Sequence, residues 1–292
     1  MKENLLLVIN PTAGSINVNE VVAKAREWSN KPEFNINIYK TSGKNDDARI
    51  EQLLQAKDYK RVVVAGGDGT INMVASKLLN KDIVLGILSC GSANGLATSL
   101  QIPKKLDEQF EIAFKHHPLS IDTLFINDIF CVHIADVGIN AELIYNYETS
   151  KTSGMLGYAI QSIPTLFKSN YPYKFKIFIE DKVIENKGVL LAFANAKKYG
   201  TGAIINPEGK IDDGSFEVIL YKRLSIWEVL KTFLRNRSNK ETSMEIYRTK
   251  SVSVKCKTPI ALQVDGEFIG EYDTFSAHIK PQSLKLAVPN SN

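Results

Sequence analysis

Short apolar runs alternate with segments of helical periodicity along the first 120 residues. The first run is residues 5–9, and apolar residues then recur at a helical spacing between residues 18 and 28. Further runs at residues 36–40, 62–65 and 83–88 each precede another helical or short apolar segment. Strands that are apolar throughout are buried on both faces. The pattern therefore predicts an α/β domain with a doubly wound parallel sheet covered by helices.

The second half of the chain has a different period. Residues 173–179 (YKFKIFI) place aromatic and apolar side chains at every second position, residues 251–256 also alternate, and glycine-bearing turns separate many short runs. Alternation of this kind predicts antiparallel strands with one buried face, as in a β-sandwich. Two segments, 154–167 and 226–234, are predicted as helices within it.

Composition adds little beyond excluding some classes of protein. The chain has 292 residues, 44% of them hydrophobic, and a net charge of +4 without a dense basic run, which does not favour nucleic acid as a partner. The five apolar residues near the amino terminus are too few for a signal peptide core or a membrane span. Three widely spaced cysteines suggest neither a disulfide framework nor a zinc site, so we expect a reducing cytoplasm.

Small, polar, glycine-bearing loops follow the four predicted strands of the first domain. They read NPTAGS, TSG, GGDGTIN and CGSANG, and such loops lie along one edge of a parallel sheet, where helix amino termini favour phosphate. Each loop alone is also compatible with a plain strand-to-helix turn. The run GGDGT is more specific, because three specified glycines fall together by chance at roughly 3 in 10,000 positions. The sequence contains neither a Walker loop nor a GxGxxG fingerprint.

In this order along the chain, the motifs resemble the diacylglycerol kinase catalytic domain family, which includes bacterial lipid kinases and sphingosine kinases. GGDGT after a strand, NPTAG near the start, GSANGLA, IDTLFIN, VGINAEL, NAKKYGTG, KIDDGSFEV and VDGE all occur in the family's order. The resemblance implies an ATP-binding α/β domain at residues 1–122, completed by residues 284–292 as an added strand, and a lipid-binding β-sandwich domain at residues 123–283. It also implies ATP and Mg²⁺ as cofactors.

Roles for individual residues follow from the motifs and the resemblance together. Asp68 would hold Mg²⁺, directly or through water, although a carboxylate at that place could also be a helix cap. Asp265 and Glu267 would lie on one face of a strand, with Glu267 accepting the proton of the lipid hydroxyl and Asp265 directed toward the metal or a lysine or arginine partner. The motif leaves open which of the two is the base, and a solvated hairpin that carries two acids is the alternative interpretation. The expected nucleotide-binding residues are Asn10, Pro11, Gly14, Thr41, Gly66, Gly67, Asp68, Gly69, Thr70, Asn72, Gly91, Ser92 and Asn94.

The sequence also suggests roles for several further positions. The DDG motif offers the Asp213 carboxylate and the backbone carbonyls of Lys210 and Ser215 for a structural Mg²⁺ ion, against the alternative of a simple Asp-Gly turn. The four histidines form no ligand spacing and are interpreted as surface or sheet residues. Gly95 stands where many bacterial members of the family have an aspartate and is more like the small residue of sphingosine kinases, so the resemblance does not single out diacylglycerol as the acceptor. Residues 154–167 could cover an acyl chain, or simply pack on the sandwich.

The sequence thus predicts an ATP-dependent kinase that phosphorylates the hydroxyl of a lipid such as diacylglycerol or a sphingoid base. Its partners would be ATP and a lipid at a membrane surface, with peripheral membrane association and no nucleic acid, and a homodimer stays open. Two alternatives remain: a soluble-metabolite kinase of the NAD kinase type, and a catalytically silent nucleotide or lipid sensor.

Overall fold

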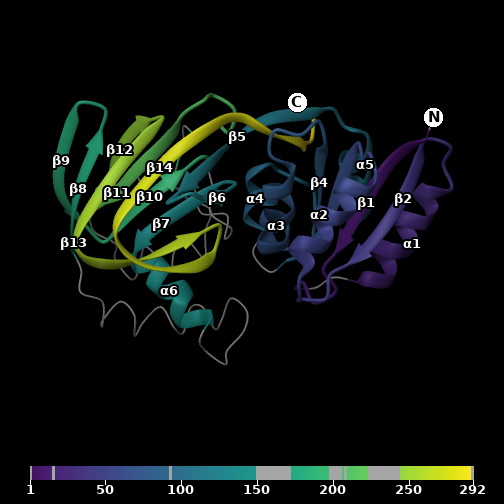
Figure 1. Cartoon of the computed structure of the whole chain (residues 1–292), viewed down its shortest axis with the longest axis horizontal. Helices are drawn as coiled ribbons and strands as arrows, with labels where there is room; N and C mark the ends of the chain where they lie inside the picture. The colour runs from purple at the N-terminus through teal and green to yellow at the C-terminus, as the bar shows by residue number, and fades with distance from the viewer. Residues whose placement is uncertain are drawn as a thin grey trace. The chain divides into compact units, whose positions relative to one another are not determined.

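The computed structural model describes residues 2–14, 17–91, 94–148, 172–196, 206, 209–222 and 244–290 (Figure 1). The chain divides into two compact units, Met1–Ile121 with Gln282–Asn292 and Asp122–Pro281. Both segments predicted as helices in the second half, 154–167 and 226–234, lie outside the described residues.

The first unit alternates strands and helices as its apolar pattern predicts. Its elements are β1 (Glu3–Ile9), α1 (Val18–Ser29), β2 (Phe34–Lys40), α2 (Asp46–Ala56), β3 (Arg61–Gly66), α3 (Asp68–Leu78), β4 (Val84–Ser89), α4 (Gly95–Ser99) and α5 (Leu106–Lys115). The four strands pair in parallel in the order β2, β1, β3, β4.

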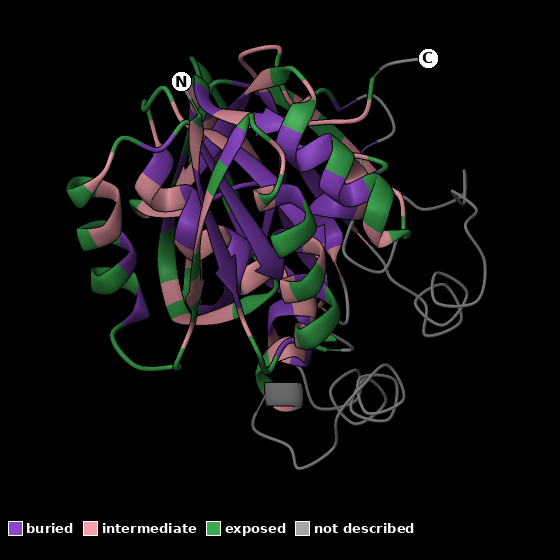
Figure 2. Ribbon diagram, turned by 90° about the vertical axis from the view of Figure 1, so that its right-hand side faces the viewer, coloured by how far each residue is buried: buried purple, intermediate pink, exposed green. Residues whose placement is uncertain are grey.

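The sheet of the first unit is covered on both faces, which explains its continuous apolar runs. The odd-numbered apolar residues of β1 pack with α1 and α5 in one core that contains an aromatic cluster of Trp28, Phe34, Phe110 and Phe114. The helix α3 contacts β3 and β4 and buries Ile71, Val74 and Leu78. In Figure 2 the central strands of this unit are buried while its helices keep exposed outer faces, and the edge strand β2 buries only Phe34 fully. Such a doubly wound arrangement confirms the predicted α/β class.

The second unit is a β-sandwich with antiparallel pairing, as predicted. Its strands run in the order β12, β11, β10, β7, β13, β14, with β9 and β8 continuing from β13, and β6 and β5 joining β14. These strands are β5 (Pro118–Ile126), β6 (Ile129–Cys131), β7 (Ile134–Gly138), β8 (Tyr173–Ile179), β9 (Lys182–Gly188), β10 (Leu190–Ala194), β11 (Phe216–Tyr221), β12 (Met244–Thr249), β13 (Ser251–Val264) and β14 (Glu267–Ala287); the helix α6 (Ile139–Glu148) follows β7.

The alternation in residues 173–179 proves to be the signature of one buried sheet face. Tyr173, Phe175, Ile177 and Ile179 all belong to the main core of the second unit, whereas Lys174 and Lys176 between them are exposed. The core also takes residues from β7, β10, β11, β13 and β14. The period of two therefore identifies correctly which side chains enter the sandwich.

The end of β14 belongs to the first unit. Lys285 and Leu286 pair in parallel with Val84 and Leu85 of β4, so β14 adds a fifth strand to the sheet. The Lys285 ammonium lies 2.5 Å from the Asp82 carboxylate, and a ring nitrogen of His116 lies 3.0 Å from the Val288 carbonyl oxygen. Residues near both ends of the chain thus build one sheet.

Candidate active site

The strand order of the first unit creates a switch point at the carboxyl ends of β1 and β3. From β1 the chain moves to β2 on one side and then returns to β3 on the other, and ligands of open α/β sheets bind outside such a point. Asn10 follows β1 and ties the two loops together. Its backbone N–H donates to the Ala65 carbonyl at 2.9 Å, and its side-chain amide donates to the Thr70 hydroxyl at 2.9 Å.

The two glycine loops that follow β3 and β4 pack backbone to backbone. A Cβ atom added at Gly91 would lie 2.5 Å from the Gly67 Cα, and one added at Gly67 would lie 3.2 Å from the Gly91 Cα. At Gly66 an added Cβ would lie 2.9 Å from the Thr70 Cβ. These positions lack side chains because the loops leave no room for them, which is one reason why glycine recurs here.

Asp68 is the first residue of α3, and its carboxylate binds the amino terminus of a second helix. It accepts hydrogen bonds from the backbone N–H groups of Gly95 at 2.8 Å and Leu96 at 3.2 Å, at the start of α4. Asp68 is thus a helix cap, although for α4 and not for its own helix. Residue 95 meets Asp68 through its backbone N–H, a contact that does not require a side chain.

Asn94 closes the loop between β4 and α4. It has a left-handed backbone with φ of 52°, and its side-chain amide exchanges two hydrogen bonds with Gly91: the Gly91 N–H donates to Oδ1 at 2.8 Å, and Nδ2 donates to the Gly91 carbonyl at 2.7 Å. Ser92, the neighbouring expected ligand of the nucleotide, lies outside the described residues. The described contacts give Asn94 a role in shaping the loop.

Thr41 lies at the carboxyl end of β2, in a loop held by a residue that the motifs did not single out. The Thr41 N–H donates to the Ile9 carbonyl at 2.9 Å. The buried Asp46 carboxylate accepts hydrogen bonds from the Tyr39 hydroxyl at 2.5 Å and from the N–H groups of Ser42 and Gly43. Burial raises the pKa of Asp46, but these hydrogen bonds outweigh it and leave the pKa below its usual value.

The remaining expected nucleotide-binding residues of the first unit lie in the same loops and helix start. Pro11 and Gly14 are exposed in the loop after β1, whereas Gly69, Thr70 and Asn72 belong to the first turns of α3. The structure thus brings the loops after β1, β3 and β4 together around Asp68 and Asn10.

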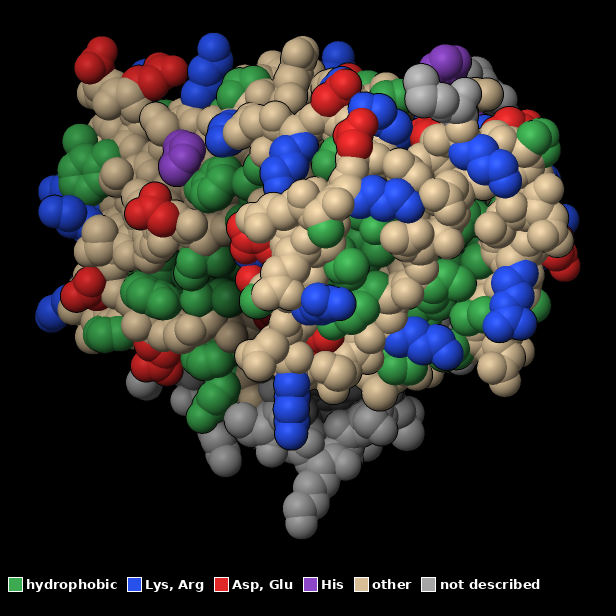
Figure 3. All heavy atoms as spheres, turned by 45° about the vertical axis from the view of Figure 1, so that its right-hand side comes forward, with side chains coloured by type: hydrophobic (Ala, Val, Ile, Leu, Met, Phe, Trp, Pro, Cys, Tyr) green, Lys and Arg blue, Asp and Glu red, His purple; other side chains and the backbone are tan. Residues whose placement is uncertain are grey.

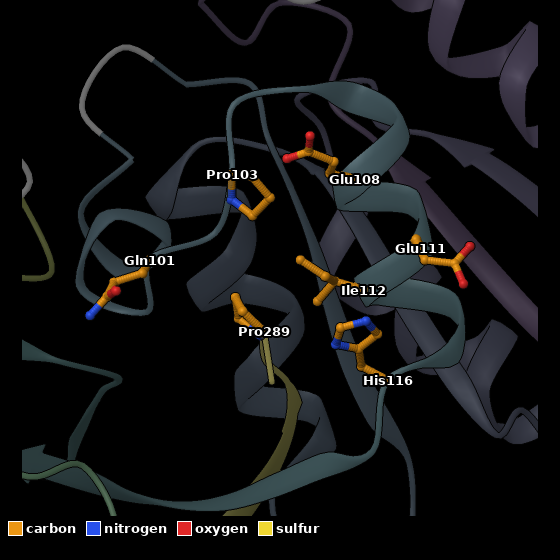
Figure 4. A pocket seen from close by; sticks show the side chains of 7 residues that line it. All are labelled: Gln101, Pro103, Glu108, Glu111, Ile112, His116 and Pro289. Atoms are coloured by element: carbon orange, nitrogen blue, oxygen red, sulfur yellow. The ribbon is translucent and has the colours of Figure 1, made fainter. Parts of the chain in front are cut away.

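A hollow of about 380 Å³ in the first unit lies elsewhere (Figure 4). Its walls come from α5, from the segment after α4 and from Pro289, and its lining includes Glu108, Glu111 and His116. Both carboxylates pair with neighbouring lysines, Glu108 with Lys105 and Glu111 with Lys115. The hollow is open, and the charges of its two glutamates are paired with lysines. It does not include the glycine loops. The candidate site is therefore defined by the geometry of those loops.

In the second unit, Asp213 is held in a turn and paired with arginine. One Asp213 carboxylate oxygen accepts from the Ser215 N–H at 3.1 Å, and the other lies 2.7 Å from the Arg248 guanidinium. The following Gly214 N–H donates to the buried Asp122 carboxylate at 2.6 Å, and Lys210 is exposed beside this turn. Because Arg248 already neutralises Asp213, a cation here would have to compete with it, which does not favour the predicted metal site.

The prediction that Asp265 and Glu267 share a strand face is wrong. Asp265 and Gly266 form the turn between β13 and β14, so Asp265 is buried while Glu267, the first residue of β14, is exposed. The Asp265 carboxylate lies 2.7 Å from the Nδ1 atom of His133, a partner that the motif did not predict. His133 is buried and lies just before β7, which contradicts its interpretation as a surface or sheet residue.

Neither a ready-made metal centre nor a membrane-spanning helix is found among the described residues. Within the described ranges, no three histidine, cysteine, aspartate or glutamate side chains gather closely enough to hold a metal ion by themselves. No helix in the same part of the chain has the length and apolarity needed to cross a membrane. Asp68 still fits a hydrated Mg²⁺, because its described contacts are two N–H donors and each carboxylate oxygen has a further lone pair.

The fold and the loops define a class of two-unit protein in which a doubly wound sheet with phosphate-type loops is joined to a β-sandwich. A family model for the diacylglycerol kinase catalytic domain matches residues 4–126, and one for the YegS C-terminal NAD kinase beta sandwich-like domain matches residues 134–288. The chain belongs to the diacylglycerol kinase family, and the suspected resemblance is confirmed.

Two relatives align with nearly the whole chain. A Chromohalobacter salexigens protein named "Probable lipid kinase YegS-like" is 26% identical over 98% of this chain and 93% of its own length. A Staphylococcus saprophyticus diacylglycerol kinase is 23% identical over 99% of this chain and 97% of its own length.

Solved structures share the fold. The crystal structure of a Bacillus anthracis diacylglycerol kinase has a TM-score of 0.75 at 19% identity, covering 99% of this chain and 97% of that one. Yeast NADH kinase has a TM-score of 0.54 at 12% identity, covering 100% of this chain and 84% of that one. The predicted fold class, an α/β domain with a doubly wound parallel sheet followed by an antiparallel β-sandwich, is therefore confirmed.

Proposed function

We propose that this kinase transfers the γ-phosphoryl group of ATP to the hydroxyl of a lipid such as diacylglycerol or a sphingoid base. The observation that carries the proposal is the match of two family models in sequence, residues 4–126 and 134–288, to a diacylglycerol kinase catalytic domain and its companion sandwich. Full-length similarity to proteins named as lipid kinase and diacylglycerol kinase supports the lipid acceptor.

Phosphate binding is assigned to the glycine loops and the start of α3. The first N–H groups of a helix have no hydrogen-bond partner within the helix. Together with the helix dipole, these groups favour the binding of an anion. Here Gly67 precedes the helix and Gly69 lies in its first turn, next to the closely packed Gly91 loop. Backbone groups can therefore approach the triphosphate without interference from side chains, while Asn10 and Thr70 fix the loop geometry.

Asp68 is assigned to the metal. A bound Mg²⁺ would neutralise charge on the phosphates during transfer. The carboxylate is already oriented by the N–H groups of Gly95 and Leu96, so it needs no reorganisation to hold the hydrated ion. The Asp213 turn is assigned a structural role, since Arg248 occupies its carboxylate.

Glu267 is assigned as the acceptor of the hydroxyl proton. A bond forms between the lipid hydroxyl oxygen and the γ-phosphorus, and the bond from that phosphorus to the bridging oxygen breaks, so ADP leaves with the electron pair. The hydroxyl proton passes to the Glu267 carboxylate, which is exposed at the start of β14. Asp265 is buried and already accepts several hydrogen bonds, which makes it a poorer candidate.

A lipid acceptor would bring the enzyme to a membrane surface, so we expect a cytoplasmic protein with peripheral membrane association. The face drawn in Figure 3 carries lysine and arginine side chains scattered among acidic and apolar ones, in keeping with the net charge of +4. Such a mixed surface tolerates an anionic bilayer without requiring nucleic acid as a partner.

The test is a transfer assay with γ-labelled ATP and Mg²⁺ against diacylglycerol, sphingosine, ceramide and monoacylglycerol in mixed micelles, with NAD as a soluble acceptor. A labelled lipid is the expected product. Asp68→Ala should lower kcat at least about 100-fold, and Glu267→Gln should lower kcat more than it raises the KM for ATP. Labelled NADP without any labelled lipid would replace this proposal with the NAD kinase alternative, and ATP binding without transfer to any acceptor would favour the silent sensor.

A further inference from the structure

The turn before Glu267 determines where this residue enters strand β14. Val264 pairs with Glu267 across a two-residue loop, and both loop residues have positive φ, 49° at Asp265 and 92° at Gly266. A two-residue hairpin of this kind favours Asp-Gly. The Gly266 N–H also donates to the Gln263 side-chain oxygen at 2.8 Å. The first residue of β14 is therefore placed by the turn.

Hydrogen bonds from a second segment to the Asp265 carboxylate hold this turn. Three consecutive N–H groups, those of Val132, His133 and Ile134, donate to it at 2.6, 3.0 and 3.2 Å. The Asp265 N–H donates in return to the Ile134 carbonyl at 2.9 Å. Successive N–H groups that converge on one carboxylate form an anion-binding concavity. The segment between β6 and β7 thus holds the turn from the side.

The His133 side chain also contacts the Asp265 carboxylate. Its Nδ1 atom lies 2.7 Å from the Asp265 carboxylate, and both side chains are buried, with 6% and 4% of their surfaces exposed. The His133 carbonyl accepts the Asn195 N–H at 2.8 Å, so the backbone of the histidine is fixed as well. Buried hydrogen-bonded pairs of this kind hold one geometry because leaving either partner alone is unfavourable.

The charge state of Asp265 follows from these contacts. Burial alone would raise the pKa of this carboxyl group, but His133 and the backbone N–H groups outweigh burial and lower the pKa to about 2. A carboxylate with so low a pKa is a weak base at neutral pH. Asp265 is therefore suited to hold the turn and poorly suited to take a proton from a hydroxyl.

We propose that His133 is a positioning residue, which holds the Asp265 carboxylate and so fixes the turn from which Glu267 meets the acceptor hydroxyl. This inference rests on the proposed function, because it takes Glu267 as the proton acceptor. Asp265 then acts through the position of Glu267 and not as the base itself. Neither His133 nor its contact with Asp265 follows from the VDGE motif, since the two residues are 132 positions apart.

The decisive comparison is between two replacements of His133. His133→Asn keeps an N–H donor near the place of Nδ1, whereas His133→Leu fills the space without a donor. We expect the Leu variant to lower kcat for the lipid at least about 10-fold with the KM for ATP within roughly 2-fold, and the Asn variant to recover most of the rate. His278→Leu, at an exposed histidine that stacks on Phe125, is the matched control and should leave kcat unchanged.

Asp265→Asn separates positioning from proton transfer. If Asp265 acts through position, Asp265→Asn should lower kcat at least as much as His133→Leu, because it also weakens the contacts with the backbone N–H groups, and the double variant should lose less than the sum of the two. If Asp265→Asn abolishes turnover while residues 262–268 keep wild-type amide exchange, Asp265 is a base and the proposal is overturned. Equal activity of His133→Leu and wild type would overturn it as well.

Amide hydrogen exchange gives a reading that does not depend on activity. In His133→Leu, peptides covering residues 130–136 and 262–268 should exchange faster, whereas a peptide covering β8 should keep its protection and show that the fold is intact. Unchanged exchange at residues 262–268 would overturn the proposed link. If wild-type protein phosphorylates no lipid, the proposed function fails by itself, and this exchange comparison still decides whether His133 holds the turn.

Discussion

The contact between the two glycine loops makes Gly91→Ala a sharp test of the candidate site. An alanine Cβ at residue 91 would lie 2.5 Å from the Gly67 Cα and 3.0 Å from the Asn94 Oδ1 atom. The first neighbour is backbone, so it cannot rotate out of the way. The loops must therefore separate by about 1 Å to reach an ordinary contact distance of 3.4 Å or more.

Separation of the loops should lower both the stability and the turnover of the Gly91→Ala protein. Overpacking of this kind destabilises a protein by about 1–3 kcal/mol, which corresponds to a fall in Tm on the order of 5 °C for a chain of this size. Separating the loops also displaces the groups assigned to phosphate, and a displacement of about 1 Å lowers turnover on the order of 100-fold. Activity should therefore suffer more than stability.

The assay is thermal unfolding together with steady-state kinetics, with ATP as the varied substrate. Gly214→Ala is the control, because an added Cβ there meets nothing within 4 Å and the only strain is the φ of +71°. That strain amounts to roughly 1–2 kcal/mol, so the control should lower Tm and leave the KM for ATP unchanged. A Gly91→Ala protein with wild-type Tm and kinetics would refute the backbone-to-backbone packing of the loops.

Two further predictions concern the second unit. Asp213→Ala should lower Tm by a few degrees, equally with and without Mg²⁺, because it breaks the Arg248 pair and the turn; a Tm difference that depends on Mg²⁺ would restore the metal interpretation. The low pKa of Asp265 contributes stability above pH about 4 that is lost as the pH falls toward 2, roughly 2 kcal/mol in all. Acid unfolding of Asp265→Asn should lack this component, and parallel acid titrations of the two proteins would contradict the assignment.

Hydrophobic periodicity predicted the architecture well because burial determines it locally. The run at residues 62–65 is apolar throughout and becomes the fully buried strand β3, while the alternation at residues 173–179 becomes the one-sided strand β8. The GGDGT motif likewise predicted a strand that passes into a helix at Asp68. In each case neighbours in sequence supply the pattern, so the sequence alone carries the signal.

Contacts between distant residues could not be predicted in the same way. The bond from Asp68 to the start of α4 joins residues 27 positions apart, and Asp265 contacts His133, 132 positions earlier, next to the paired strands β13 and β7. A histidine beside an apolar strand gives no sign of its partner. The alternative interpretation of VDGE as a hairpin is the one that the structure matches, because Asp265 and Gly266 form a two-residue turn, although Asp265 is buried in it and not solvated.

The end of β14 has a consequence for how the chain folds as it is synthesised. The first unit gains its fifth strand when Lys285 pairs beside Val84, about 200 residues later in the chain. On the ribosome, the early strands and helices can associate first. The edge of β4 that pairs with β14 stays unpaired until the second unit has been synthesised. Until then that edge is a template for unwanted pairing, so a fragment that ends after residue 121 should aggregate more readily than the complete chain.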